Sequence, residues 1–193
     1  EKIKDFCLRV SKRCPVLVDE AYIHYLEGWT TQTVAPLIKE GANLLVSRTF
    51  SKIYGMAGLR IGFLMGPGIL IKELENQFTL GFPGNMPNSL SVAAAIGALQ
   101  DDNFIISSRQ KNATSRENLY ASFDQLGLKY LPSTTNFVYF DVVDFPAFKR
   151  LMQKHQIVLA GGWPSKPNWA RVTISNHQEM NYFQDRIKGK TWL

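Results

Sequence analysis

The sequence predicts an α/β protein in which a mostly parallel sheet with flanking helices precedes a small C-terminal α+β domain. Three observations predict this fold class. Two short apolar runs, residues 15–19 and 43–47, each end in a polar residue, which is typical of buried parallel strands. Helical patterns occupy the stretches around these runs. After Leu128 the pattern changes to strand, helix, strand, strand, helix, which suits a small α+β domain.

The elements of the first part follow from hydrophobic periodicity and from the positions of Pro and Gly. Ile3, Phe6, Cys7 and Val10 share one face of a helix that Pro15 ends. The expected elements are a helix at 2–13, strands at 15–19, 43–47 and 59–65, helices at 33–40 and 68–78, a loop at 81–88, and a helix at 88–100.

A long helix at 102–126, closed by Gly127, leads into the second part. Asn176 is the expected N-cap of the last helix, with Glu179 in its first turn. The remaining expected elements are strands at 136–141, 156–160 and 170–174 and helices at 145–154 and 177–188. We therefore expect two domains, 1–101 and 102–193.

Composition and charge exclude several classes of protein. The chain has 193 residues and a net charge of +6, but no run of five Lys or Arg residues, so a nucleic-acid partner is not expected. Anionic small molecules explain the charge equally well. No apolar run reaches the ~18 residues of a membrane-spanning helix, so no membrane partner is expected. Cys7 and Cys14 have no matching second pair, which predicts reduced thiols and no metal site.

The chain begins Glu-Lys-Ile-Lys, which is neither a start methionine nor a signal peptide. We expect that an upstream segment has been lost or removed. The cytoplasm is the expected compartment by default, and periplasmic export stays open because an export signal would lie upstream.

Residues 47–62 gather a lysine, hydroxyl groups, glycines and an arginine directly after a predicted strand. Ligands bind at the C-terminal ends of parallel strands. Hydroxyl groups and arginine donate hydrogen bonds to phosphate, and Gly55 and Gly58 let the backbone approach a ligand closely. A lysine amine can also form an imine with a carbonyl group. A lone lysine is usually a solvated surface charge, so the combination around Lys52 carries the prediction.

A second group of polar residues follows the first predicted strand. Asp19 ends the apolar run, and Tyr22 lies three residues later. An aspartate at this place can cap a helix, bind a metal or pair with a cationic ring nitrogen. Tyr22 can donate a hydrogen bond to a phenolate-type oxygen.

Taken together, these segments resemble the fold-type I pyridoxal-phosphate (PLP) aminotransferases of class I/II, especially the histidinol-phosphate aminotransferase-like branch. The resemblance covers the C-terminal half of such enzymes. The segments that carry it are Asp19-Glu20-Ala21-Tyr22, Ser47-Arg48-Thr49-Phe50-Ser51-Lys52 and Gly55-x-x-Gly58-x-Arg60-x-Gly62.

The resemblance implies a catalytic group and a cofactor site. Lys52 would form the Schiff base with PLP and carry a proton between the substrate Cα and the cofactor. Asp19 would pair with the pyridinium nitrogen, and Tyr22 would hydrogen-bond the 3′-oxygen of the cofactor. The expected ligands of the cofactor phosphate are Thr49, Ser51 and Arg60.

Two residues of the second part are expected to bind the substrate. By the same resemblance, Arg171 would grip the α-carboxylate in a bidentate pair. Asn136 would lie where the small domain approaches the active site, although a side-chain-to-backbone hydrogen bond explains it equally well. The three histidines lack partners at ligand spacing, and none is expected to be catalytic.

The implied activity is transfer of an amino group between an amino acid, or a histidinol-phosphate-like amine, and a 2-oxo acid, as in amino-acid biosynthesis. The resemblance also implies a homodimer. The loop 81–88, with Phe82 and Met86, is a candidate element of its interface, although internal packing explains this loop equally well. Two alternatives remain open. One is another PLP reaction, such as decarboxylation or racemisation, and the other is a non-catalytic regulatory domain with this fold.

The sequence departs from the family at two points. The N-terminal half of the cofactor site is not present, so this chain by itself is expected to bind PLP poorly and to be inactive. The arginine that such enzymes use for a substrate phosphate is also absent from 157–164. Lys166 lies nearby and could take the place of this arginine, but its ammonium group is a point charge and lacks the two parallel donors of a guanidinium. Trp163 and Trp169 instead suit an aromatic or apolar substrate, although ordinary loop packing explains them equally well.

Overall fold

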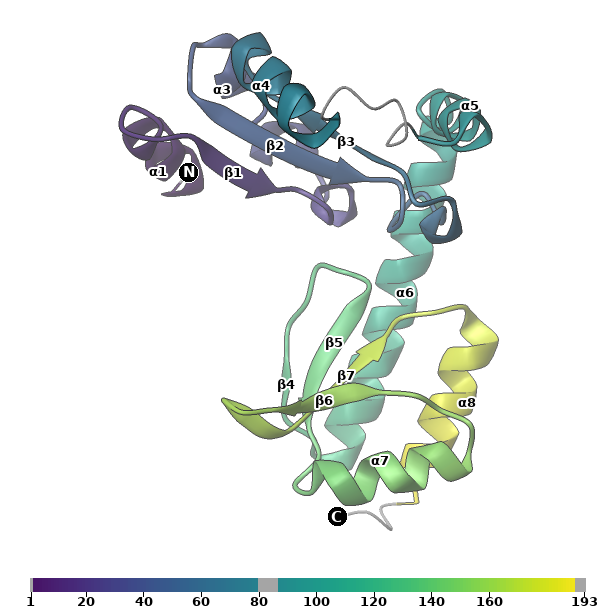
Figure 1. Cartoon of the computed structure of the whole chain (residues 1–193). Helices are drawn as coiled ribbons and strands as arrows, with labels where there is room; N and C mark the ends of the chain where they lie inside the picture. The colour runs from purple at the N-terminus through teal and green to yellow at the C-terminus, as the bar shows by residue number, and fades with distance from the viewer. Residues whose placement is uncertain (1, 80–86, 190–193) are drawn as a thin grey trace. The chain divides into compact units, whose positions relative to one another are not determined.

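The computed structural model describes residues 2–79 and 87–189. The chain divides into two compact units, Glu1–Ile106 and Ser107–Leu193, and the division falls inside the long helix α6 (Asp102–Leu126) (Figure 1). Most of the loop expected at the dimer interface, including Phe82 and Met86, lies outside the described residues.

Unit 1 contains a three-stranded sheet in the order β1-β2-β3 (Figure 1). Strands β1 (Val16–Asp19) and β2 (Leu44–Thr49) pair in parallel, as expected, with Asp19 opposite Ser47. Strand β3 (Gly62–Met65) pairs with β2 in the antiparallel direction. The chain returns from β2 to β3 through the loop that contains Lys52, without the crossover helix that a parallel pairing usually needs. The sheet is therefore mixed.

Short helices surround this sheet, and several expected boundaries change. The strand predicted at 59–65 begins only at Gly62, because residues 57–59 form a 3₁₀ turn and Arg60 has a positive φ of 51°. The helix predicted at 33–40 is shorter, since Pro36 occupies its first turn. The helical elements of unit 1 are α1 (Lys2–Val10), η1 (Ile23–Tyr25), α2 (Trp29–Gln32), α3 (Pro36–Lys39), η2 (Ala57–Leu59), α4 (Gly68–Thr79) and α5 (Ser89–Ala98).

One face of the sheet forms a core. Leu44 and Val46 are fully buried against Cys7 of α1 and Leu37 of α3. The strand predicted at 15–19 as a buried strand is covered on one face only, because the Leu17 side chain on its other face is 64% exposed. Only the alternate side chains of β1 pack on the helical core. An apolar run shows that a strand forms, but not how many of its faces are covered.

Unit 2 is a four-stranded antiparallel sheet with helices α7 (Phe145–Lys154) and α8 (His177–Ile187) and the C-terminal part of α6. The strand order is β4-β5-β7-β6. Its core is rich in aromatic rings, with Phe123 stacked on Phe140 at a centroid distance of 4.6 Å. The strands are β4 (Tyr130–Leu131), β5 (Phe137–Asp141), β6 (Ala160–Trp163) and β7 (Lys166–Thr173).

Most elements of unit 2 match the predicted order, and three strands differ. The strand predicted at 156–160 lies at Ala160–Trp163, and the strand predicted at 170–174 already begins at Lys166, so the two strands form a tight hairpin. Strand β4 was not predicted. The expected cap is confirmed, because the Asn176 side chain accepts a hydrogen bond of 2.9 Å from the Glu179 backbone N–H.

Within the described ranges, no helix is long and apolar enough to cross a membrane, and no three His, Cys, Asp or Glu side chains cluster as metal ligands would. Cys7 and Cys14 are both free thiols, the first buried and the second exposed. Burial raises the pKa of the Cys7 thiol, and the nearby Glu20 carboxylate raises it further.

Candidate active site

The loop after β2 presents Lys52 between two anchored residues. Phe50 and Tyr54 are 3% and 8% exposed and pack, with Ile53, in a core cluster of unit 1. Burial is the main cause that raises the pKa of the Tyr54 phenol. The Phe50 N–H donates to the Ile61 carbonyl at 3.2 Å. Lys52 is only partly buried, so the loop fixes the backbone on either side and leaves the amine available.

The structure brings Lys52 and Tyr22 together. Nζ of Lys52 lies 5.1 Å from the centre of the Tyr22 ring, within the range of a cation–π contact. Tyr22 follows β1 and Lys52 follows β2, and these strands are parallel neighbours. Their C-terminal ends therefore meet at the same edge of the sheet, where ligands bind in α/β folds.

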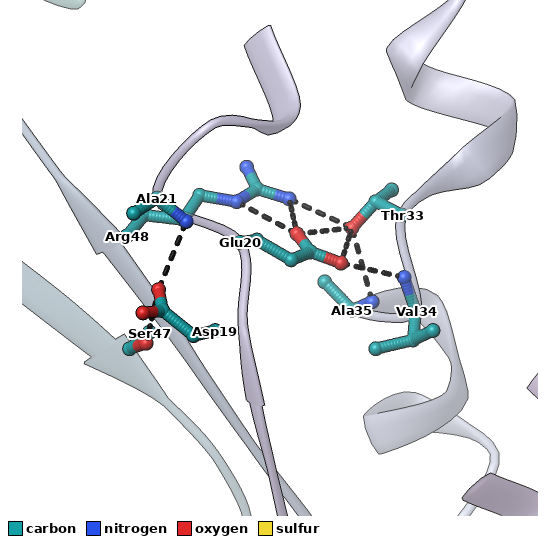
Figure 2. Close-up of polar contacts among 8 residues, drawn as sticks. All are labelled: Asp19, Glu20, Ala21, Thr33, Val34, Ala35, Ser47 and Arg48. Carbon is teal, nitrogen blue, oxygen red and sulfur yellow. Dashed lines mark hydrogen bonds and ion pairs between the residues drawn. The ribbon is translucent and has the colours of Figure 1, made fainter. Parts of the chain in front are cut away.

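Asp19 lies at that same edge. One carboxylate oxygen, Oδ1, accepts hydrogen bonds from the Ala21 N–H at 2.9 Å and from the Ser47 hydroxyl at 3.1 Å (Figure 2). Oδ2 has no hydrogen-bond partner among the described residues, and the side chain is exposed. The carboxylate is thus oriented through one oxygen, and the other is available to a ligand.

The three expected phosphate ligands differ in their surroundings. The Thr49 hydroxyl accepts from the Ser51 N–H at 3.1 Å and donates to the Ile61 carbonyl at 3.4 Å, so it is engaged inside its own loop. The Arg60 guanidinium donates to the Ala57 carbonyl at 2.9 Å. Arg60 also lines a solvent-open pocket of about 670 Å³ with Gly58 and the residues that begin α5.

Arg171 and Asn136 lie in unit 2. Arg171, on β7, pairs with Tyr139 of β5 and Ala160 of β6, and its guanidinium carbon lies 5.3 Å from the centre of the Phe137 ring. Its Nε is buried and has no hydrogen-bond partner among the described residues. A buried arginine N–H without an acceptor is costly, so this atom is suited to receive an anionic group.

Asn136 precedes β5 and is half-buried. Its backbone carbonyl accepts a hydrogen bond of 2.7 Å from the Ile174 N–H. A hydroxyl network on the preceding residues holds this turn: Ser133 Oγ lies 2.9 Å from Thr135 Oγ1, and Asn112 donates to the Thr135 carbonyl. Other side chains and the Asn136 backbone thus hold this turn, and no hydrogen bond of the Asn136 side chain is present among the described residues.

Two groups of residues near these positions were not expected from the sequence. Glu20 and Arg48 form an ion pair of 2.8 Å beneath Asp19 and Thr49. Phe137 and Tyr139 flank Arg171 on its face of the sheet, with ring centroids 5.5 Å apart. The acid next to Asp19 and the alternation in 137–141 were the available signals. Neither signal predicts which residue the side chain contacts, because the contacts join strands that are distant along the chain.

Comparison with known proteins identifies the family. The family described as aminotransferase class I and II matches residues 1–187. The chain belongs to the class I and II aminotransferase family. It is 37% identical over 190 residues to histidinol-phosphate aminotransferase 2 of Pseudomonas fluorescens (strain Pf0-1), covering 97% of this chain and 50% of that protein. It is 34% identical to histidinol-phosphate aminotransferase of Limosilactobacillus fermentum, covering 100% and 51%.

Solved structures of this aminotransferase family share the fold. Histidinol-phosphate aminotransferase from Sinorhizobium meliloti, in complex with pyridoxal-5′-phosphate, has a TM-score of 0.79 at 28% identity and matches 95% of this chain and 50% of that one. The enzyme from Clostridium acetobutylicum has a TM-score of 0.83 at 20% identity, which shows the fold alone, and covers 98% and 58%. The chain thus spans about half the length of its aminotransferase relatives.

Proposed function

We propose that the protein is a PLP-dependent aminotransferase that exchanges an amino group between an amino acid and a 2-oxo acid. The observation that carries this proposal is the position of Lys52 over the Tyr22 ring, at the sheet edge where Asp19 presents a carboxylate oxygen. Membership of the class I and II aminotransferase family supports it. The other PLP reactions and the regulatory domain considered from the sequence gain no support from the relatives.

The residues present fit a pyridoxal phosphate group. Oδ2 of Asp19 is available to a protonated ring nitrogen, and the Tyr22 hydroxyl suits the ring oxygen. Arg60 and the Ser51 hydroxyl supply donors for a phosphate, and the Thr49 hydroxyl would join them only by giving up its bond to the Ile61 carbonyl. The cationic pocket beside Arg60 and the buried Nε of Arg171, which has no partner within the described ranges, both call for anionic groups.

Each residue has a defined task in this proposal. When bound, PLP supplies a ring that accepts the electron pair left at the substrate Cα. The Lys52 amine holds the cofactor and moves the proton from Cα. Asp19 keeps the ring nitrogen protonated. Arg171 holds the substrate α-carboxylate through a bidentate pair, and Asn136 lies at the end of the adjacent strand.

A spectroscopic half-reaction tests this function. The protein expressed in full from its own gene should show a visible absorbance band with added PLP. An amino acid should shift the band, and a 2-oxo acid should restore it. Lys52→Ala should abolish both changes. Release of carbon dioxide, or racemised amino acid without the shift, would show a different PLP reaction.

The preferred amino donor is a neutral amino acid, with an aromatic side chain favoured. Arg171 lies among aromatic rings. Its cross-strand partner Tyr139 contacts Phe137 at 5.5 Å and Trp163 at 5.1 Å between ring centroids. Lys166 is held over the Trp169 ring at 4.4 Å. Among the described residues around Arg171, its guanidinium is available to a carboxylate, and no second arginine lies beside it to bind a phosphate. The relatives' names favour histidinol phosphate instead.

Gly161 and Gly162 lie in the segment 157–164, from which the phosphate-binding arginine is absent. An ideal Cβ on Gly162 would lie 2.8 Å from Phe145, and Gly162 has a positive φ of 71°. A larger side chain is strained at this position.

The ratio of kcat/KM for phenylalanine to that for histidinol phosphate decides between the two donors, and a ratio below one contradicts an aromatic donor.

The protein is proposed to act as a homodimer through α5. This helix is mostly apolar, yet Leu90 and Ile96 within it and Leu99 at its C-terminal cap are 76%, 56% and 55% exposed. A helix that is apolar all round is normally buried. Analytical ultracentrifugation should show a dimer that Ile96→Glu converts to monomer. An unchanged mass for Ile96→Glu would place the interface elsewhere.

Residues 1–101 are proposed to be part of the large domain of the enzyme, and residues 102–193 to be its small domain.

The cytoplasm is the proposed compartment. Two unpaired thiols, one of them exposed, suit a reducing compartment. Cell fractionation of the native producer tests the location, and recovery in the periplasm would contradict it.

A further inference from the structure

Glu20 and Arg48 form a buried ion pair beneath the candidate cofactor residues. Their side chains are 5% and 10% exposed. Arg48 donates to Oε2 of Glu20 from both Nη2, at 2.8 Å, and Nε, at 3.1 Å (Figure 2). Because both N–H groups are used, the guanidinium plane is fixed relative to the carboxylate.

Thr33 and Val34 complete the coordination of Glu20. The Val34 N–H donates to Oε1 at 2.8 Å, and the Thr33 hydroxyl donates to the same carboxylate (Figure 2). The Thr33 oxygen in turn accepts from Arg48 at 2.8 Å and from the Ala35 N–H at 3.2 Å. The hydroxyl therefore uses its one donor and both acceptor positions. This set, Glu20, Thr33 and Arg48, is called the buried ionic network below.

Each charged member of the buried ionic network adjoins a candidate cofactor ligand. Glu20 follows Asp19, and its N–H donates to the Ser47 carbonyl at 2.9 Å, which extends the parallel ladder by one residue. Arg48 lies between Ser47 and Thr49 on β2. Successive side chains of an extended strand point to opposite faces. The ion pair thus lies on the core face, while Asp19 and Thr49 lie on the ligand face.

A chain of rings extends the buried ionic network to the Lys52 loop. The Arg48 guanidinium lies 4.9 Å from the Trp29 ring, and Trp29 contacts His24 at 4.6 Å. His24 contacts Tyr54 at 5.4 Å, and Tyr54 contacts Phe50 at 4.9 Å. Phe50 and Tyr54 are the residues that anchor the backbone on either side of Lys52. His24 also lies two residues after Tyr22.

Stability alone is a weak reason for such a pair. Removing two charges from water costs several kcal/mol, and apolar replacements of buried pairs are often neutral or stabilising. A bidentate ion pair, by contrast, links the two strand ends in one fixed geometry, which an apolar contact does not do.

We propose that the Glu20–Arg48 pair is a positioning device that sets Asp19 relative to Lys52 at the cofactor site. This proposal rests on the proposed function. Both side chains lie on the core face of the sheet, away from the ligand face, and both act through their neighbours in sequence. The effect should therefore appear in PLP binding and in the titration of the visible band rather than in folding stability.

The test separates positioning from stability with variants of the protein expressed in full from its own gene. Glu20→Leu combined with Arg48→Met removes both charges and leaves neither unpaired. Arg48→Lys keeps the charge and loses the fork. Asp185→Asn is the control, because it removes an ion pair of the same 2.8 Å length on the exposed surface of unit 2. The readouts are the thermal midpoint without cofactor, the Kd for PLP, and the pH titration of the visible band.

The double variant is expected to keep its thermal midpoint within a few degrees of the wild-type value. It should nevertheless bind PLP at least about tenfold more weakly and show a shifted pH titration of the visible band. Arg48→Lys should show a smaller change of the same kind, and Asp185→Asn none. Wild-type PLP affinity and titration in the folded double variant overturn the proposal. Failure of all the Glu20 and Arg48 variants to fold overturns it too, because the pair would then be a folding requirement. If the wild-type protein binds no PLP, the proposed function itself fails.

Discussion

The ammonium nitrogen of Lys52 lies 5.1 Å from the centre of the Tyr22 ring, so the lysine that follows β2 rests on the aromatic face that follows β1. A contact of this kind contributes about 0.5–1 kcal/mol at an exposed site. The ring of Tyr22 thus orients the amine, in addition to any role of its hydroxyl group.

Two substitutions separate the ring of Tyr22 from its hydroxyl group. Tyr22→Phe keeps the aromatic face and should lower PLP affinity only a few-fold, whereas Tyr22→Leu also releases Lys52 and should cost a further few-fold. Titration of the visible absorbance band with PLP measures both. Equal losses in the two variants would show that the ring contact contributes nothing.

Arg171 should matter only for substrates that carry a carboxylate. Arg171→Lys retains the charge but loses the bidentate fork, so kcat/KM for an amino acid should fall about tenfold to a hundredfold. The corresponding amine without a carboxylate should react as slowly with the variant as with the wild type. An equal loss for the amine would mean that the substitution damages the fold of unit 2.

Gly161 should not tolerate a side chain. An ideal Cβ at this position would lie 2.5 Å from the Trp169 carbonyl oxygen and 2.4 Å from the Phe145 ring. The backbone oxygen cannot move aside easily, so Gly161→Ala should destabilise the protein by about 1–3 kcal/mol in urea unfolding.

The matched control for Gly161→Ala is Gly97→Ala in α5. A Cβ on Gly97 would meet nothing within 4 Å. Alanine favours a helix over glycine, so this variant should be more stable by about 0.5–1 kcal/mol. Destabilisation of similar size in both variants would contradict the packing explanation.

Stability should decrease in alkali because of Tyr25. Burial, and secondarily Tyr22, raise the pKa of the Tyr25 phenol from 10.0 to about 12. The unfolded chain therefore loses this proton before the folded chain does. The free energy of unfolding should hold its full value below pH 10 and fall as the pH rises towards about 12.

Tyr25→Phe should reduce this alkaline dependence. Burial also raises the pKa of Tyr54 and Tyr130, so part of the dependence remains. Urea midpoints across the pH range measure the slope. A slope identical to that of the wild type would mean that Tyr25 is solvated in the folded state.

Much of the fold could be predicted from local patterns. The parallel pair β1 and β2, the long helix α6 and the Asn176 cap all follow from short-range signals. Periodicity and caps act within a few residues, so a sequence reports them directly. The hairpin between β6 and β7 was missed, because a Gly- and Pro-containing run can be a loop or the turn of a hairpin.

The sequence by itself determined the residue types of the candidate site: a lysine, an aspartate and a tyrosine after two strands, and an arginine on a third. Only the tertiary structure decided which of them meet. It placed Lys52 over Tyr22, engaged Thr49 within its own loop, and joined Glu20 to Arg48 across 28 residues. The reason is that strand register and burial set these contacts, and both depend on segments that are remote along the chain.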